Sequence, residues 1–168
     1  AVSDWRLARA VSRAGYFFVL SSTEIDTVLV RRHPDGDPDG HVRRAMAAFP
    51  IPGVADAVRD RYFLPTGRPP GEPYALLSMH RAHASLARQQ VVMLASFVEV
   101  YLAREGHDGL VGVNLLTKVQ MPNLPSLYGA MLAGVHYVLM GAGIPKEIPG
   151  VLDAFAEHRP ASLKLDVE

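Results

Sequence analysis

The sequence predicts an α/β protein of parallel strands with helical crossovers, and three observations support this prediction. The residues from Leu110 to Leu116 are almost wholly apolar, as in a parallel strand that is buried on both faces. Pro125 and Ser126 then begin a helical pattern, and a second short apolar run, from Tyr137 to Met140, follows it. A strand, a helix and a strand in this order form a βαβ unit, whose crossover is right-handed.

The whole chain is expected to form a single domain, residues 1–168, because its length suits one substantial core. Four strands are expected, at residues 16–21, 110–116, 136–140 and 162–167. In the last of them Leu163, Leu165 and Val167 alternate with polar residues. The alternation of strands and helices resembles a partial (β/α)8 TIM barrel, a fold of about 250 residues. A small open α/β sheet is the alternative.

A helical insertion of about residues 31–84 is expected after the first strand. Its short helical patterns are broken by prolines and cover residues 41–49, 53–62 and 65–73. Because the insertion follows the carboxyl end of a strand, we interpret it as a lid over the face where sites form. A peripheral insertion is the alternative. A long helix over residues 85–104 then returns the chain to the second strand.

The composition argues against several classes of partner. Lys plus Arg and Asp plus Glu both number 17, so the charge does not favour a nucleic-acid partner. No run of about 18 apolar residues occurs, so no membrane partner is expected. The chain has no Cys, which excludes thiolate metal sites and a Cys nucleophile and fits a cytoplasmic localisation.

No metal site is expected. Asp35, Asp37 and Asp39 alternate in a turn segment, but this segment lacks the later bidentate Glu of a calcium-binding EF-hand loop. His80 and His83 are three residues apart, but no acidic residue is spaced to join them on one helix face. Both sets are therefore interpreted as solvated surface residues.

One polar side chain, Asn114, lies inside the second strand near its carboxyl end. In parallel α/β folds ligands bind at the carboxyl ends of the strands, which makes Asn114 a candidate binding residue. The alternative is that its carboxamide only satisfies the backbone of a neighbouring loop.

The stretches VGVNLL, PSLYGAMLAGV and YVLMGAGIP, with SDWRLARAVSRAG and GHVRRAMAAFP before them, resemble the nitronate monooxygenase (2-nitropropane dioxygenase) family. The likeness extends over essentially the whole chain and is greatest to the family's longer bacterial branch. It implies an FMN-binding TIM barrel that oxidises alkyl nitronates, its small-molecule substrates, with molecular oxygen.

The resemblance implies roles for four residues. Asn114 matches the Asn of the family's G-V-N motif, which lies close to the flavin, where a carboxamide can donate to and accept from the isoalloxazine edge. Lys118 follows the same strand and would favour a reduced, anionic flavin, with a solvated loop lysine as the alternative. Gly141 and Gly143 would let the backbone approach the ligand closely, or would serve only the tight turn.

The chain also departs from the family pattern. The family's first strand would precede Ala1, and its phosphate-binding loops and catalytic histidine would follow Glu168, so no catalytic residue is assigned. Phe18 stands where relatives carry a small residue, which puts the fit of flavin near this strand in question. Position 136 is His where Asp is expected.

Three functional interpretations are open. The first is part of an FMN-dependent nitronate monooxygenase, active only with the rest of the barrel. The second is a flavin-dependent enoyl reductase, which shares the same strand motifs. The third is a non-catalytic truncated or divergent half-barrel. Open sheet edges favour self-association, so a homo-oligomer is expected.

Overall fold

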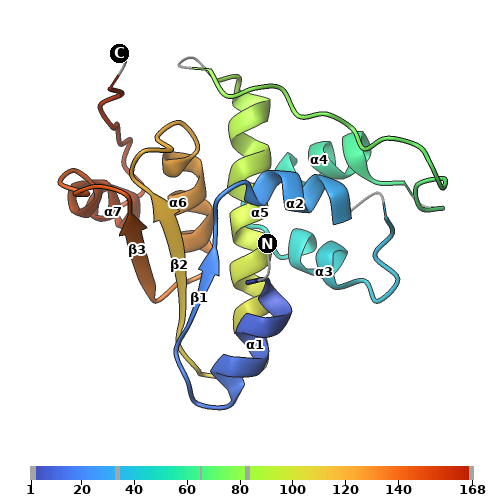
Figure 1. Ribbon diagram of the computed structural model, residues 1–168, viewed down its shortest axis with the longest axis horizontal. Helices are drawn as coiled ribbons and strands as arrows, with labels where there is room; N and C mark the ends of the chain where they lie inside the picture. Colours follow the sequence, from blue (N-terminus) through green and yellow to red (C-terminus); the bar gives the residue numbers. More distant parts are fainter. Residues whose placement is uncertain (1–2, 33–34, 65, 82–83, 167–168) are drawn as a thin grey trace.

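A computed structural model of the chain describes residues 3–32, 35–64, 66–81 and 84–166. Within these ranges three strands form one open parallel sheet in the order β1-β2-β3: β1 (Phe18–Ser21), β2 (Val111–Leu116) and β3 (Tyr137–Gly141). The predicted α/β fold with parallel strands and helical crossovers is confirmed in this form (Figure 1).

Seven helices are described: α1 (Trp5–Arg13), α2 (Ile25–Arg32), α3 (His41–Ala47), α4 (Val54–Tyr62), α5 (Leu86–Arg104), α6 (Asn123–Leu132) and α7 (Ile148–Ala156). Asp4 caps α1, because its carboxylate accepts from the backbone N–H groups of Arg6 and Leu7, each at 3.1 Å. Ser85 caps α5 in the same way through the N–H of Arg88, at 3.3 Å.

The register of the strands divides the sheet into two faces. Leu20, Val113 and Val138 share one face, and the first two of them are fully buried in the core beneath the helices. The opposite face is more open, since Tyr137 and Leu139 are 52% and 40% exposed there. We refer to this second face as the open face.

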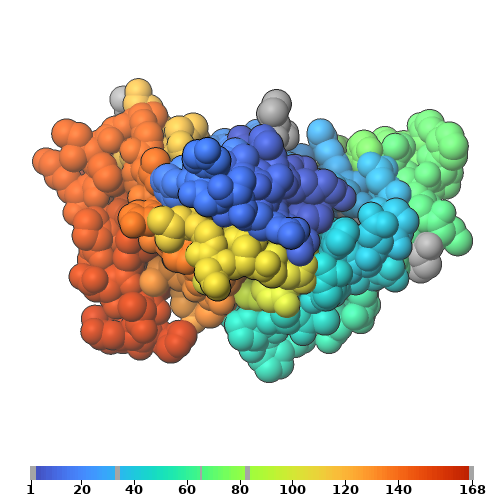
Figure 2. Space-filling view, turned by 90° about the horizontal axis from the view of Figure 1, so that it is seen from below, coloured from blue at the N-terminus to red at the C-terminus, as the bar shows by residue number. Residues whose placement is uncertain are grey.

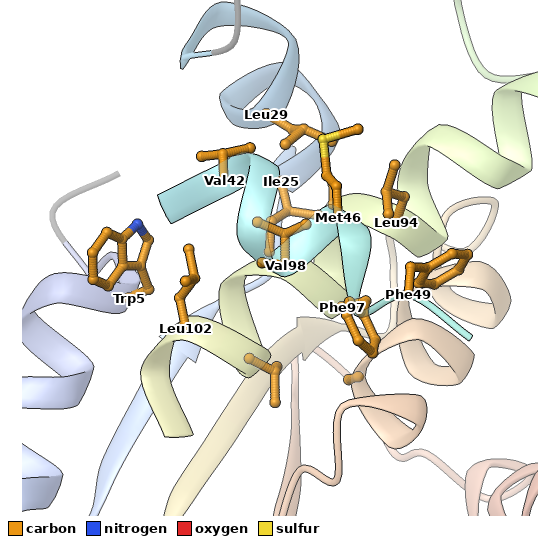
Figure 3. Packing of buried hydrophobic residues seen from close by; sticks show 14 of the residues in the cluster. Trp5, Ile25, Leu29, Val42, Met46, Phe49, Leu94, Phe97, Val98 and Leu102 are labelled. Atoms are coloured by element: carbon orange, nitrogen blue, oxygen red, sulfur yellow. The ribbon is translucent and has the colours of Figure 1, made fainter. Parts of the chain in front are cut away.

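Helix α5 is the centre of the molecule. Its 19 residues are apolar on nearly all sides, and it contacts α1, α2, α3, α4 and α6. Figure 3 shows Leu94, Phe97 and Val98 of this helix among the side chains of α2 and α3. None of the described helices, α5 included, combines the length and apolar composition that a membrane span requires.

Helices α5 and α6 pack with their backbones unusually close. A Cβ atom at Gly129 would lie 2.0 Å from the carbonyl oxygen of Met93, so only glycine fits at that position. One turn away the hydroxyl of Ser96 donates to the carbonyl of Ser126 at 2.8 Å. Small side chains on both helices therefore allow α6 to cover the sheet directly beside α5.

The helical insertion is confirmed in part. Two predicted helices appear as α3 and α4, but the third is wrong, because residues 66–73 contain turns and no helix. Pro69, Pro70 and Pro73 remove three backbone donors from this segment, which explains why no helix forms.

Helices α3 and α4 pack against α5, so they form a layer beside it and not a lid over the strands. Figure 2 shows α3 beside α1 and the end of α5, with the β3–α7 region on the other side.

The predicted fourth strand is wrong, because residues 162–166 form no strand, and Val167 lies outside the described residues. Exposure alternates along this segment as the sequence pattern requires. Its neighbour is the turn after β2, where Gln120 accepts from the backbone N–H of Asp166 at 3.0 Å, and not the edge of β3. An alternating pattern fixes which side chains are buried but does not supply a partner strand.

Candidate functional site

Two backbone hydrogen bonds just after the last paired residues align the carboxyl ends of the three strands. The N–H of Ser22 donates to the carbonyl of Asn114 at 3.0 Å, and the N–H of Thr117 donates to the carbonyl of Gly141 at 2.8 Å. Because the strands are parallel, the three turns that follow them lie at one edge of the sheet. This edge carries all four residues that the resemblance assigns to the cofactor site.

Asn114 lies on the open face, opposite Ser21 of β1 and Leu139 of β3 in the register. Its side chain is half-buried, and its Oδ1 atom is 4.0 Å from the position of a Cβ at Gly141. Among the described residues its carboxamide has no hydrogen-bond partner, which argues against the alternative that it satisfies a loop backbone. Both its donor and its acceptor are available to a ligand.

Lys118 lies in the turn after β2, two residues beyond the end of the strand, and is exposed. No carboxylate in the described parts of the chain pairs with its ammonium group. The structure therefore places a cation at the same edge of the sheet as Asn114, at the surface of that edge.

Gly141 and Gly143 accommodate neighbours within the chain. A Cβ at Gly143, where φ is +153°, would be 3.0 Å from the Cβ of Thr117. A Cβ at Gly141 would be 3.3 Å from a methyl group of Leu116. Between them Ala142 has a φ of 58°, a left-handed conformation that costs a non-glycine residue about 1–2 kcal/mol. This geometry favours the tight-turn interpretation of the two glycines.

The amino end of the open face is covered by two aromatic rings, whose pairing no local sequence pattern reveals. Phe17 and Tyr137 are in edge-to-face contact, with ring centroids 5.2 Å apart. They meet over Gly112, where an added Cβ would lie 2.9 Å from Phe17 Cζ. The open face is therefore aromatic at one end and polar at the other, where Ser21 and Asn114 lie.

Phe18 and His136 lie away from this site. Phe18 is opposite the fully buried Val111 and packs against the core, so its ring is on the helix-covered face. His136 accepts from the backbone N–H of Val111 at 3.1 Å through Nδ1, at the amino end of the strands. Phe18 therefore does not obstruct a ligand on the open face, and His136 has a structural role.

A second polar cluster, also missed in the sequence, lies beside the start of α2. Asp26 of α2 and Arg88 of α5 form a buried ion pair, with the two residues 3% and 8% exposed. His80 contacts both, with Nε2 2.9 Å from Arg88 Nη2 and 3.6 Å from Asp26 Oδ2. Burial and the charge of Arg88 lower the pKa of His80 below its usual 6.5. The pairing joins residues 62 positions apart, so no local sequence pattern reveals it.

The aspartates of the turn segment are not simply solvated. Asp37 is bonded to the backbone N–H of Arg43 at 2.9 Å, and Asp35 accepts from the hydroxyl of Tyr74 at 2.6 Å. Within the described ranges no three His, Cys, Asp or Glu side chains are placed to share a metal ion. His83 lies outside the described residues.

Comparison of the chain with protein-family models, with curated proteins and with solved structures gave no match. The resemblance to nitronate monooxygenases therefore rests on the sequence stretches alone.

Proposed function

We propose that this chain forms one wall of an FMN-binding (β/α)8 barrel of the nitronate monooxygenase kind, with Asn114 on its inner face. The observation that carries the proposal is the unpartnered carboxamide of Asn114 on the open face at the carboxyl end of a parallel sheet. In a (β/α)8 barrel the helices cover only the outer face, and ligands bind at the carboxyl ends. The sequential strand order β1-β2-β3 agrees with such a wall.

The open face suits a flat, largely apolar ring system. Tyr137 and Leu139 supply exposed apolar surface, while Asn114 supplies one donor and one acceptor. Ligand sites commonly combine apolar walls with a few placed polar groups of this kind. FMN, when bound, would supply the redox chemistry with oxygen. Asn114 would hold the edge of the ring, and the cation of Lys118 would attract an anionic substrate such as a nitronate to the same edge.

Turnover by this chain alone is not part of the proposal. The site of a (β/α)8 barrel is assembled from the loops of many strands, and phosphate is usually held after strands seven and eight. A flavin-dependent enoyl reductase would use the same features of β2 and β3. The two activities are distinguished by the reductant, since only the reductase consumes a nicotinamide cofactor together with an enoyl substrate.

The test is the absorbance spectrum of the purified chain after it is soaked in FMN and desalted. We expect retained flavin bands for the wild type. Asn114→Leu should weaken FMN binding by about 1–3 kcal/mol, because it removes hydrogen bonds to a buried ring edge. Gln90→Leu is the control, since this carboxamide lies on the helix side, in a groove between α5, α6 and α7.

Each outcome has a definite reading. A folded wild-type chain without flavin would contradict FMN binding and favour the non-catalytic interpretation. Equal affinity in Asn114→Leu and in the wild type would remove Asn114 from the site. A loss in Gln90→Leu as large as that in Asn114→Leu would mean that the effect is not specific to the open face.

A further inference from the structure

Residues 77–80 cross the end of the molecule toward which the strands point, in the green segment of Figure 1 before α5. We call these residues the strap. They have no helix or strand structure, yet three contacts hold them to the body. Leu77 packs against the main core, the carbonyl of Ser78 accepts from Arg88 Nε at 2.9 Å, and His80 contacts Arg88 and Asp26.

We infer that docking of the strap depends on pH. The strap is held on the buried Asp26–Arg88 pair while His80 is neutral, and it is released when His80 is protonated. The inference does not rest on the proposed flavin site, because none of the anchoring residues is on the open face.

The tautomer of His80 is fixed by the geometry. Nε2 of the ring is 2.9 Å from a guanidinium nitrogen of Arg88. A guanidinium group only donates hydrogen bonds, so Nε2 must be the acceptor and must carry no proton. Protonation of Nε2 would place an N–H group directly against an N–H group of Arg88. The hydrogen bond would be lost, and two positive charges would face each other.

The groups around the ring decide the direction of the effect. Asp26 from α2 and Arg88 from α5 are the charged groups of the described chain that face His80. Asp26 would attract a protonated ring, but its carboxylate already pairs with Arg88 at shorter range. Burial and the charge of Arg88 outweigh Asp26 and lower the pKa of His80. Acidification therefore works against the docked strap.

The strap has little else to hold it. Met79 is 83% exposed between its two polar anchors, and Leu76, immediately before the strap, is 95% exposed. Loss of the His80 contact leaves Leu77 and one carbonyl to hold the segment. Release of the strap would also expose the Asp26–Arg88 pair to water. Because burial of two charges is costly, this exposure favours exchange of the strap between a docked and a released state.

The absence of Cys allows a site-specific probe of this exchange. A nitroxide spin label on Met79→Cys would report the mobility of the strap by electron paramagnetic resonance between about pH 8 and about pH 5. We expect the immobile fraction to fall from the major to the minor component on acidification. The same label on Ile144→Cys, a 77% exposed position after β3, is the control and should not change.

A second variant and a second measurement complete the test. Adding His80→Gln to the labelled protein supplies an acceptor that does not titrate, so the strap should stay immobile at both pH values. In the chain without substitutions, the histidine titration by NMR should place the midpoint of His80 below 6.5. This midpoint should coincide with that of the label's mobility change.

The inference is overturned if the label at position 79 keeps the same mobility across the range. It is also overturned if His80→Gln shows the same pH response, or if the two midpoints differ. Failure of FMN binding would leave these measurements unaffected, so the two proposals are tested separately.

Discussion

The carboxylate of Glu99 accepts a hydrogen bond from the backbone N–H of Trp5, at 2.9 Å. Trp5 is the first residue of α1, and Glu99 lies in the C-terminal half of α5, so a buried side chain satisfies a free donor at the start of another helix. Arg32, the last residue of α2, contacts both Glu99 and Asp4. One charged cluster thus joins three helices that are distant in the sequence.

Removing this carboxylate should destabilise the fold strongly. Glu99→Ala leaves the buried N–H of Trp5 without an acceptor and leaves Arg32 with Asp4 alone, so it should lower the free energy of unfolding by about 1–3 kcal/mol. Glu99→Gln keeps an acceptor for the Trp5 N–H and should cost clearly less. Urea unfolding followed by far-ultraviolet circular dichroism measures both. Equal losses in the two variants would mean that the hydrogen bond to Trp5 contributes nothing.

The close contact of α5 and α6 gives a second prediction, with a matched pair of glycines. Gly129→Ala forces a Cβ to within 2.0 Å of the Met93 carbonyl oxygen, so the helices must separate and stability should fall by about 1–3 kcal/mol or more. Gly150 also lies inside a helix, but a Cβ there meets no atom within 4 Å.

Gly150→Ala should therefore raise stability by about 0.5–1 kcal/mol, because alanine favours the helix. Thermal unfolding of the two variants beside the wild type is the measurement. A loss of stability in Gly150→Ala as large as in Gly129→Ala would show that the α5–α6 approach is not the cause.

The sequence predicted the elements whose burial follows from their own composition. The apolar run of β2 and the helix α5 were found because each is apolar enough to be buried on most sides. The strand predicted at residues 162–167 is wrong because a strand needs a partner strand, and residues 162–166 lie beside Gln120 instead. The helix predicted over residues 65–73 is wrong because three of the described residues, 66–73, are prolines, which lack the backbone donor that a helix needs.

In the candidate site, too, the sequence predicted only what depends on a local property. Asn114 was found because its place near the end of a strand is a local property. Ser21 and Phe17 were missed because their nearness to Asn114 and Tyr137 depends on the register between strands. The Asp26–Arg88 pair was missed because it forms only when α2 packs on α5.

The pH dependence of stability can be tested at Glu105. Arg44 donates two hydrogen bonds to this carboxylate, each at 2.8 Å, and lowers the pKa of Glu105 below 4.5. The folded state therefore binds this proton less readily than the unfolded state. The contribution of Glu105 to stability is present above pH 4.5 and is lost as the pH falls through the lowered pKa.

Arg44→Gln should then lower the free energy of unfolding at about pH 7 by only about 0.2–1 kcal/mol, because the pair is partly exposed. At an acidic pH below 4.5 the difference from the wild type should be smaller, since Glu105 then begins to take up its proton and to lose its attraction to Arg44. Urea titrations at both values check the sign. A difference that grows on acidification would contradict the assignment.

Substitution of two adjacent phenylalanines tests which face of the sheet is covered by the helices and which face is open. Phe18 packs against the core beneath the helices, whereas Phe17 is 46% exposed and lies over Gly112 on the open face. Phe18→Ala should lower stability by about 3 kcal/mol, the low end of the range for a buried ring, and should not improve the retention of FMN. Phe17→Ala should cost much less, because its ring already meets solvent.

The same pair separates packing from ligand binding. If FMN occupies the open face, Phe17→Ala alters its affinity, because the aromatic end of that face is lost while the core is kept. Denaturant unfolding and FMN titration of both variants are the measurements. A large stability loss in Phe17→Ala with none in Phe18→Ala would reverse the two faces, and Asn114, on the face of Gly112, would then point into the core.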